Sequence, residues 1–387
     1  MNPEEFAGYA KEAKKYVLNT IVPKIVVGGV CGAGKSSLLN AVVKGKAFEV
    51  DPSKPCTVQN DQVNVNEQDA AICFVDSPGF SEADKDSADH AGNIRRLILM
   101  EAHLYLLVIG APNRSLDVEN QWLRTARSEQ FFSKIPGLVA INKIDIVPPI
   151  RDWNPGSVNL TAPTTQKERN ILDYVNYVSE VSEFRPFAAQ NRIIPVSAGE
   201  SFNDPLQYNL ELLRLKMFEL LPEAAKIEFG RQAHLHQHAA QAIVQKCSLA
   251  VAAEVLINPL GLGTDAAIIV PMQIAMIVHI AKVYGQHITW TFASSLLGTV
   301  ATTLLGRAIF GAVVSMIPVL KNVAGPPVAY GMTLALGGTV IELFATNKAN
   351  ASQAEIKNVA EKYKGLIESG SQECPSYEVL KTNQNLN

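Results

Sequence analysis

A glycine-rich run near the start of the chain has the residue types that bind phosphate groups. Residues 29–36 read GVCGAGKS and fit the spacing GxxxxGK[ST], after a short apolar run at Lys24–Gly29. Glycines at this spacing let backbone N–H groups turn inward around an anion. Lys35 is predicted to reach the β- and γ-phosphates and Ser36 to ligate Mg²⁺. The predicted nucleotide-binding residues here are Gly29, Gly32, Ala33, Gly34, Lys35, Ser36 and Ser37.

A second candidate site follows the apolar run Ala71–Val75, which is typical of a buried strand. The run ends in Asp76-Ser77-Pro78-Gly79. An acid at this place suits Mg²⁺, usually through water, and the Gly79 N–H is predicted to sense the γ-phosphate. The same four residues alone form a common turn. Their distance behind the glycine-rich run favours the functional interpretation.

Two further segments have the chemistry to read a purine base. Asn142-Lys143-Ile144-Asp145 follows the apolar run 138–142. The Asp145 carboxylate can accept bonds from guanine N1–H and the 2-amino group, a pattern that adenine lacks, and an unpaired buried carboxylate would reject the wrong base. Asn142 is predicted to brace the loop and the Lys143 stem to lie over the base. Ser197-Ala198 follows Arg192–Val196, and the Ala198 N–H is predicted to bind guanine O6.

Each of these candidate sites lies just past an apolar, strand-like run. Further strands are expected at Val63–Val65 and Leu104–Gly110, and helices at 36–44, 88–101, 117–130, 166–183 and 205–220. Alternating strands and helices predict an α/β domain with a doubly wound, mostly parallel six-stranded sheet. We expect an N-terminal helix at 1–20, this α/β domain at 21–222, an all-α apolar domain at 223–370 and a polar tail at 371–387.

In their order along the chain, these motifs resemble the translation-factor-like class of P-loop GTPases, and the Era-like and septin-like bacterial groups most. The matching residues are Gly29–Ser36, Thr57, Asp76–Gly79, Asn142–Asp145 and Ser197–Ala198, and the resemblance spans residues 20–222. It implies GTP and GDP binding with Mg²⁺ and two switch loops. It also implies that Thr57 ligates Mg²⁺ beside Ser36 and Asp76, and that Lys35, Thr57 and Gly79 form the catalytic set.

Two departures from the family pattern concern hydrolysis. Phe80 stands where classical small GTPases carry the glutamine that positions the attacking water, and Gly32 stands where potassium-activated relatives carry asparagine. We therefore expect slow GTP hydrolysis unless self-association or a partner supplies a missing group.

The second half of the chain is apolar and rich in small residues. A helix is expected at 223–257, followed by apolar segments at 266–281, 283–306, 308–320 and 322–341 and a final amphipathic helix containing Ile356 and Val359. A membrane-spanning helix needs about 20 apolar residues. Membrane helices, attachment to a bilayer surface and a soluble bundle with close glycine contacts all remain open. The turn PLGLGTD at 259–265, the apolar stretch 271–285 and the later stretch 317–337 also resemble a glycine-rich helical family of unknown function that follows bacterial GTPase domains. This resemblance covers residues 240–345 and implies a GTPase-linked, membrane-proximal module.

The net charge and the distribution of basic residues limit the classes of partner that we expect. The net charge is −3 and there is no long basic run, so no nucleic-acid partner is expected. The N-terminus lacks the apolar core of a signal peptide, so we expect a cytoplasmic protein associated with the cytoplasmic face of a membrane.

Together these features predict a slow GTP-dependent switch that acts at a membrane or on a protein partner through residues 250–345. A nucleotide-dependent dimer is a further candidate form. The alternatives are a non-hydrolysing GTP-binding scaffold and a dynamin-like or immunity-related membrane-remodelling GTPase.

Overall fold

The computed structural model divides the chain into two compact units, Ile21–Leu235 and the part that begins at His236. It describes residues 21–45, 62–67, 70–76, 101–201, 203–257, 264–305, 326–348 and 351–367, with residues 92, 94–96, 98 and 369. The predicted helix at 1–20, Thr57, Gly79, most of the predicted helix at 88–101, the segment 308–320 and the tail 371–387 lie outside these residues.

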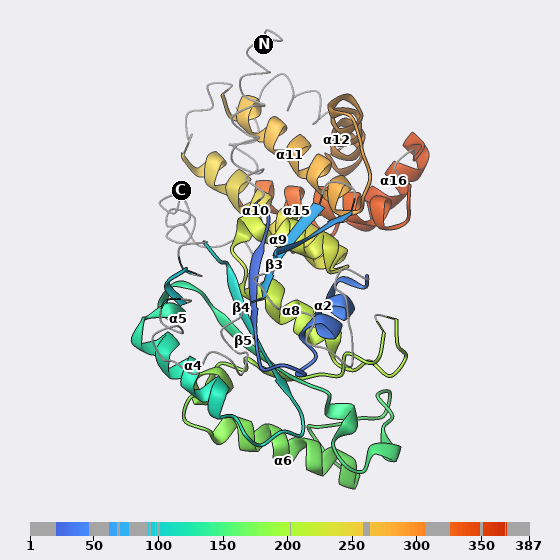
Figure 1. Ribbon diagram of the computed structural model, residues 1–387. Coiled ribbons are helices and arrows are strands. Elements are labelled where there is room, and N and C mark those ends of the chain that lie inside the picture. The colour runs from blue at the N-terminus through green and yellow to red at the C-terminus, as the bar shows by residue number, and fades with distance from the viewer. Residues whose placement is uncertain are drawn as a thin grey trace. The chain divides into compact units, whose positions relative to one another are not determined.

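The first unit is built on one six-stranded sheet (Figure 1). The strand order is β2-β3-β1-β4-β5-β6. All neighbouring strands pair in parallel except β2 and β3, which are antiparallel. The strands are β1 Lys24–Gly28, β2 Gln62–Glu67, β3 Ala70–Asp76, β4 Leu104–Gly110, β5 Gly137–Asn142 and β6 Ile193–Pro195. The predicted fold class, an α/β domain followed by a helical region, is confirmed.

Helices cover both faces of this sheet, as Figure 1 shows for α2 and α8 on one side and α4, α5 and α6 on the other. The helices of the first unit are α2 Lys35–Val43, α4 Asp117–Ser128, α5 Phe131–Lys134, α6 Gln166–Glu180, α7 Arg185–Ala189, α8 Leu210–Leu220 and α9 Glu223–Gln232. Two short 3₁₀ turns, η2 Ile144–Ile146 and η3 Ile150–Asp152, follow β5.

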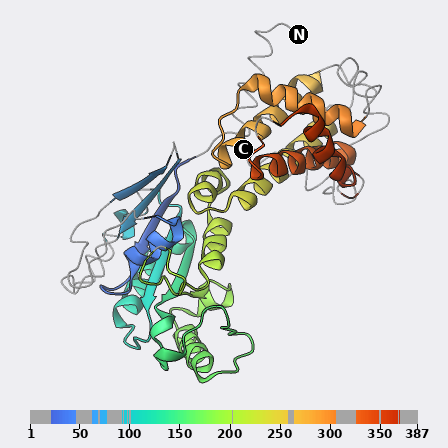
Figure 2. The ribbon, with the colours of Figure 1, turned by 90° about the vertical axis from the view of Figure 1, so that its right-hand side faces the viewer.

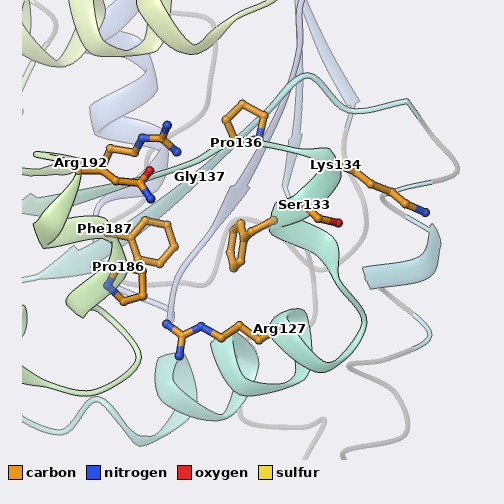
Figure 3. Close-up of a pocket in the computed structure, with 10 residues that line it drawn as sticks. Arg127, Ser133, Lys134, Pro136, Gly137, Pro186, Phe187 and Arg192 are labelled. Carbon is orange, nitrogen blue, oxygen red and sulfur yellow. The ribbon is translucent and has the colours of Figure 1, made fainter.

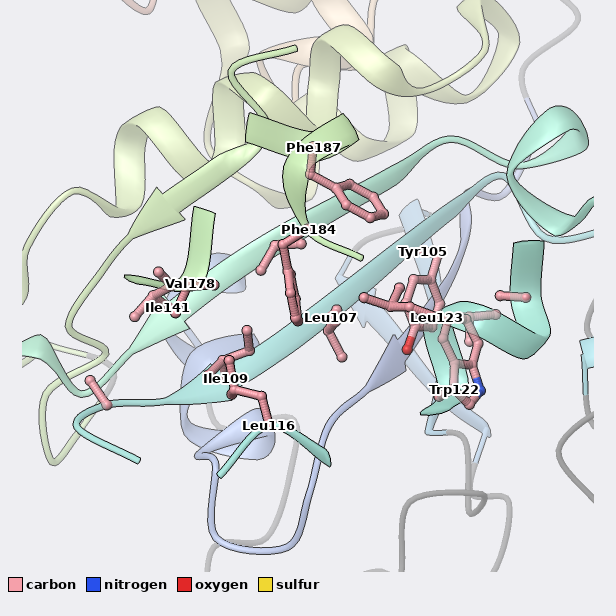
Figure 4. Packing of buried hydrophobic residues seen from close by; sticks show 14 of the residues in the cluster. Tyr105, Leu107, Ile109, Leu116, Trp122, Leu123, Ile141, Val178, Phe184 and Phe187 are labelled. Atoms are coloured by element: carbon pink, nitrogen blue, oxygen red, sulfur yellow. The ribbon is translucent and has the colours of Figure 1, made fainter. Parts of the chain in front are cut away.

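The face of the sheet under α4–α7 holds the core shown in Figure 4. Alternate residues of β4, namely Tyr105, Leu107 and Ile109, belong to this core, as the period of two in a strand requires. The Tyr105 ring stacks on the Trp122 ring with centroids 4.4 Å apart, and Phe131 meets Trp122 edge-on at 5.6 Å. The core therefore fixes β4 and β5, whose ends carry part of the site.

The predicted single helix at 223–257 is wrong, because the chain breaks between α9 and α10. His234 sits in the break with φ of 56°, a left-handed conformation that cannot continue a helix. α9 packs on β3 in the first unit, where Ala225 and Phe229 are fully buried. The Ala224 carbonyl also accepts a hydrogen bond of 2.9 Å from the Ile21 N–H. The first unit thus extends to Leu235, beyond the expected boundary at residue 222.

The described part of the second unit consists of helices gathered in a bundle (Figure 2). They are α10 His236–Ile257, α11 Thr264–Val283, α12 Trp290–Leu305, α15 Pro326–Ala345 and α16 Gln353–Lys362. α15 contacts all four of the others. Among the described helices, α15 alone is long and apolar enough to cross a bilayer, and 56% of its apolar window is buried in the bundle.

Glycines allow the close packing around α15. A Cβ built at Gly337 would lie 2.4 Å from Cγ1 of Val244 on α10, and one at Gly338 would lie 2.5 Å from the Tyr363 ring. At the end of α15, the Glu342 carboxylate accepts hydrogen bonds from Lys362 Nζ at 2.5 Å and from Tyr363 Oη at 3.0 Å. The apolar composition of α15 thus serves contacts between helices, as in the core of a helical bundle.

Candidate functional site

The glycine-rich loop connects β1 to α2 and has the backbone conformation that its glycines permit. Gly29, Gly32 and Gly34 have φ values of 144°, 79° and 84°, which side-chain-bearing residues rarely adopt. A Cβ at Gly29 would lie 2.2 Å from the Val108 carbonyl oxygen of β4. Gly34 caps α2 without a side-chain acceptor, so the first N–H groups of a nine-residue helix remain available to an anion.

Lys35 lies over this loop. Its ammonium group donates to the carbonyl oxygens of Gly29 at 3.1 Å and of Val30 at 3.5 Å. Ser36 and Ser37 follow in the first turn of α2 and are half-buried. The predicted phosphate-binding residues therefore lie together at the carboxyl end of β1.

Asn142 connects the glycine-rich loop to the two predicted base-reading segments. The side chain is 1% exposed, and Nδ2 donates to the carbonyl oxygens of Ala33 at 3.2 Å and Gly34 at 3.3 Å. Its Oδ1 accepts the N–H of Ala198 at 3.1 Å. One amide thus sets three backbone segments that are far apart in the sequence at fixed distances from each other.

The predicted base-reading residues also contact each other. Ser197 is fully buried, and its hydroxyl donates to Oδ1 of Asp145 at 2.7 Å. This bond leaves the second carboxylate oxygen of Asp145 without a described side-chain partner. Lys143 has φ of 63°, and its Cε lies 3.4 Å from a Cβ built at Gly34. The Lys143 stem therefore runs between the base-reading loop and the phosphate-binding loop.

The predicted magnesium ligands are only partly located. Asp76 ends β3 and pairs in register with Val27 of β1, which places its backbone beside the strand that enters the glycine-rich loop. The Asp76 side chain, Thr57 and Gly79 lie outside what the structure describes. A Mg²⁺ site formed by Ser36, Thr57 and Asp76 stays a prediction.

Sequence reasoning missed a buried lysine behind the base-reading segments. Lys167 on α6 is 1% exposed, and its ammonium group donates to the carbonyl oxygens of Asp145 and Val147. Burial lowers the pKa of Lys167 below its usual range. The available sequence signal was the capping box Thr165-Gln-Lys-Glu168, which predicts the start of α6 but gives no indication of this long-range contact.

A separate cavity of about 420 Å³ lies at the amino-terminal end of β5, around Gly137 (Figure 3). The residues that line it include the aromatic Phe132 and Phe187 and the basic Arg127, Lys134 and Arg192. Arg127 is held by an ion pair of 2.6 Å with Glu183. This cavity is at the strand end opposite to Asn142, so it is not part of the site described above.

Comparison with known proteins agrees with this geometry. Residues 24–143 match the family model described as a 50S ribosome-binding GTPase. The first unit carries a P-loop GTPase domain. Residues 231–363 match a domain of unknown function, DUF697, so the bundle is the DUF697 domain of this chain. The predicted order, a GTPase domain followed by a helical domain of unknown function, is confirmed.

Similar proteins cover mainly the GTPase domain. GTPase Era of Thermoanaerobacter sp. (strain X514) is 25% identical over 203 residues, which are 52% of this chain and 55% of that protein. The uncharacterized protein YkfA of Escherichia coli (strain K12) is 27% identical over 217 residues, 56% of this chain and 68% of YkfA. A crystal structure of Era in complex with MgGDPNP and part of 16S ribosomal RNA covers 59% of this chain and 67% of that chain at 21% identity, with a TM-score of 0.36. The chain thus matches little more than half the length of the Era relative.

Proposed function

We propose that this protein binds GTP and GDP with Mg²⁺, hydrolyses GTP slowly and acts as a nucleotide-dependent switch. The observation that carries the proposal is the position of Asn142. Its amide contacts Ala33 and Gly34 in the phosphate-binding loop and Ala198 in the second base-reading loop. This arrangement holds the phosphate-binding and base-reading loops in place before a nucleotide binds. The entropy cost of ordering these loops on binding is therefore lower.

Guanine is the base that this site favours. The Ser197 hydroxyl holds one oxygen of the Asp145 carboxylate, which leaves the other to accept guanine donors. The Ala198 N–H, predicted to bind guanine O6, donates to Asn142 Oδ1 in this structure, so a bond to O6 would have to share or replace that contact. Ser36, Thr57 and Asp76 would supply the oxygen ligands that Mg²⁺ prefers, and Mg²⁺ would neutralise charge on the β- and γ-phosphates.

Slow hydrolysis follows from the sequence of the second candidate site. Phe80 directly follows Gly79, and a phenyl ring can neither orient nor deprotonate an attacking water. The same substitution supports the second candidate function, a GTP-binding scaffold that does not hydrolyse GTP. A group from a second copy of the chain or from a partner would restore turnover.

The DUF697 domain is the proposed output of the switch. Its described helices pack their apolar faces on each other, and α15 is surrounded by α10, α11, α12 and α16. This packing favours a bundle that contacts a protein partner or the cytoplasmic surface of a membrane over a helix that spans one. Nucleotide-dependent order in the switch loops would alter that contact.

The test measures GTP hydrolysis against protein concentration, with and without anionic phospholipid vesicles. A specific rate that rises with protein concentration supports activation by self-association, and a rise only with vesicles supports a membrane-linked switch. A rate at the no-enzyme background under every condition, with GTP still bound, would exclude hydrolysis by the chain alone and support the scaffold. No binding of GTP or GDP would refute both functions.

A further inference from the structure

The proline-rich segment 148–165 lies against the loops proposed to read guanine. It follows the motif Asn142–Asp145 and ends at the first turn of α6. Side chains from the first two turns of α6 hold the segment at its start, at its middle and at its end. Asn170 Nδ2 donates to the Pro148 carbonyl at 2.8 Å, and Glu168 accepts backbone N–H groups of Asn159, Thr164 and Thr165, each at 2.8 Å. These bonds to an ionised carboxylate hold the pKa of Glu168 low, at about 2.

Lys167, next to Glu168, supports the base-reading loop from behind. Its Nζ lies 2.5 Å from the carbonyl oxygen of Asp145 and also donates to that of Val147. η2 is a single turn, Ile144–Ile146, so its carbonyl groups have few partners within the turn itself. Without this donor, the buried Val147 oxygen and the partly buried Asp145 oxygen would lose a charged partner, and the backbone that carries the Asp145 carboxylate could shift.

Trp153 connects the same lysine to the second base-reading loop. Lys167 Nζ lies 5.5 Å from the centre of the Trp153 ring, within the range of a cation–π contact. The Trp153 ring meets the Tyr208 ring edge-on at 5.8 Å, and its Nε1 donates to the Leu206 carbonyl at 3.0 Å. Tyr208 in turn pairs with Ser197, with N–H···O distances of 3.0 and 3.2 Å in the two directions.

We propose that Lys167 and Trp153 are positioning residues for base specificity, which hold Asp145 and Ser197 at the spacing that guanine requires. The inference rests on the proposed function, because it assumes that Asp145 binds the base. Neither side chain needs to touch the nucleotide. The segment 148–165 then contributes to base recognition.

The experiment compares dissociation constants of GDP and IDP, because inosine lacks the 2-amino group that the Asp145 carboxylate would bind. The full chain is titrated with each nucleotide in Mg²⁺ buffer. In wild type, GDP should bind at least tenfold more tightly than IDP, since a hydrogen bond to a charged group is at stake. Lys167→Met should weaken GDP binding more than IDP binding, so that the ratio falls several-fold towards one.

Three further variants separate positioning from general stability. Lys134→Met removes an exposed lysine at the opposite strand end and should leave the ratio unchanged. Lys167→Arg keeps donors for both carbonyl groups and should restore most of the ratio, whereas Trp153→Leu should lower it less than Lys167→Met does. If Lys167→Met fails to fold, Trp153→Leu carries the test.

The outcomes distinguish the two proposals. An unchanged GDP/IDP ratio in a folded Lys167→Met, or in Trp153→Leu where Lys167→Met does not fold, would overturn the positioning role while the proposed function stands. An equal loss of affinity for both nucleotides would also overturn it, because a merely structural role predicts that result. A wild-type chain that binds neither nucleotide would instead refute the proposed function itself.

Discussion

Asp145 is the residue on which guanine selectivity depends in this site. Its carboxylate accepts the Ser197 hydroxyl at 2.7 Å and has a second oxygen for the donors of guanine. Asp145→Asn replaces an acceptor with an amide that can donate to the 2-oxo group of xanthine. We expect the variant to lose at least tenfold in GDP affinity and to prefer XDP, measured by competition against a fluorescent nucleotide. A variant that binds GDP as wild type does and gains no preference for XDP would show that Asp145 does not read the base.

Glu119 on α4 is a buried carboxyl group whose two oxygens have no hydrogen-bond partner among the described residues. Burial raises its pKa, and Asp117 adds to that rise. The folded state therefore holds the proton more tightly than the unfolded state. The contribution of Glu119 to stability is therefore most favourable below the ordinary carboxyl pKa of about 4.3, and it falls as pH rises through the raised pKa of the folded state.

The pH dependence of stability tests this account of Glu119. Glu119→Gln should unfold at a higher temperature than wild type at pH 7, because it removes a buried charge. The difference should shrink as pH falls towards 4, where wild type carries the proton. Thermal unfolding followed by circular dichroism at several pH values gives the comparison, with Glu180→Gln on the exposed end of α6 as the control. A constant difference at all pH values would contradict the assignment.

Among the elements, α2 depends on a side chain from a distant helix. The last carbonyl groups of a helix lack partners within it. Arg214 on α8, which is 6% exposed, donates to the carbonyl oxygens of Ala41 at 2.6 Å and Val42 at 2.8 Å. α8 thus holds the helix whose first turn follows the phosphate-binding loop.

Arg214→Met should therefore destabilise the GTPase domain by about 2–4 kcal/mol, because two buried carbonyl groups lose a charged donor. Urea unfolding gives the free energy. Lys216→Met on the same helix removes only a short-range pair with Glu219, so its effect should stay below about 1 kcal/mol. Equal effects of the two substitutions would refute the proposed cap.

Local patterns were sufficient to predict most elements of the GTPase domain. The run at 104–110 coincides with β4, and the predicted strand ends carry the loops that meet at Asn142. Lys167 and Arg214 were missed because each contacts carbonyl groups far along the chain, and neither hydrophobic period nor motif spacing encodes such contacts. The break at His234 was missed for a different reason: helix-forming residues on both sides hid one left-handed position.

At the scale of the whole molecule, each unit has its own buried core. We therefore expect a destabilising substitution in one unit to leave the stability of the other unit unchanged. Gly337→Ala would bring a methyl group against Val244, and overpacking of this kind costs about 1–3 kcal/mol. Hydrogen exchange in α10 and α15 should quicken, while GDP affinity stays at the wild-type value. Gly298→Ala on α12 is the matched control, because no described atom lies within 4 Å of the added carbon. This control should be neutral or stabilising by up to about 1 kcal/mol. Loss of GDP affinity in Gly337→Ala would mean that the cores are coupled.

The attachment of α9 to β3 has a practical consequence for the design of shorter fragments of this protein. A fragment that stops at residue 222, where the sequence motifs predict the end of the domain, would lack α9 and its buried Phe229. The apolar surface along β3 that α9 covers would then be exposed. Such a fragment should precipitate or require solubilising additives. A fragment that runs through Leu235 retains the cover on β3, and it is the shorter length at which crystallisation or nucleotide titration of the isolated domain is worth attempting.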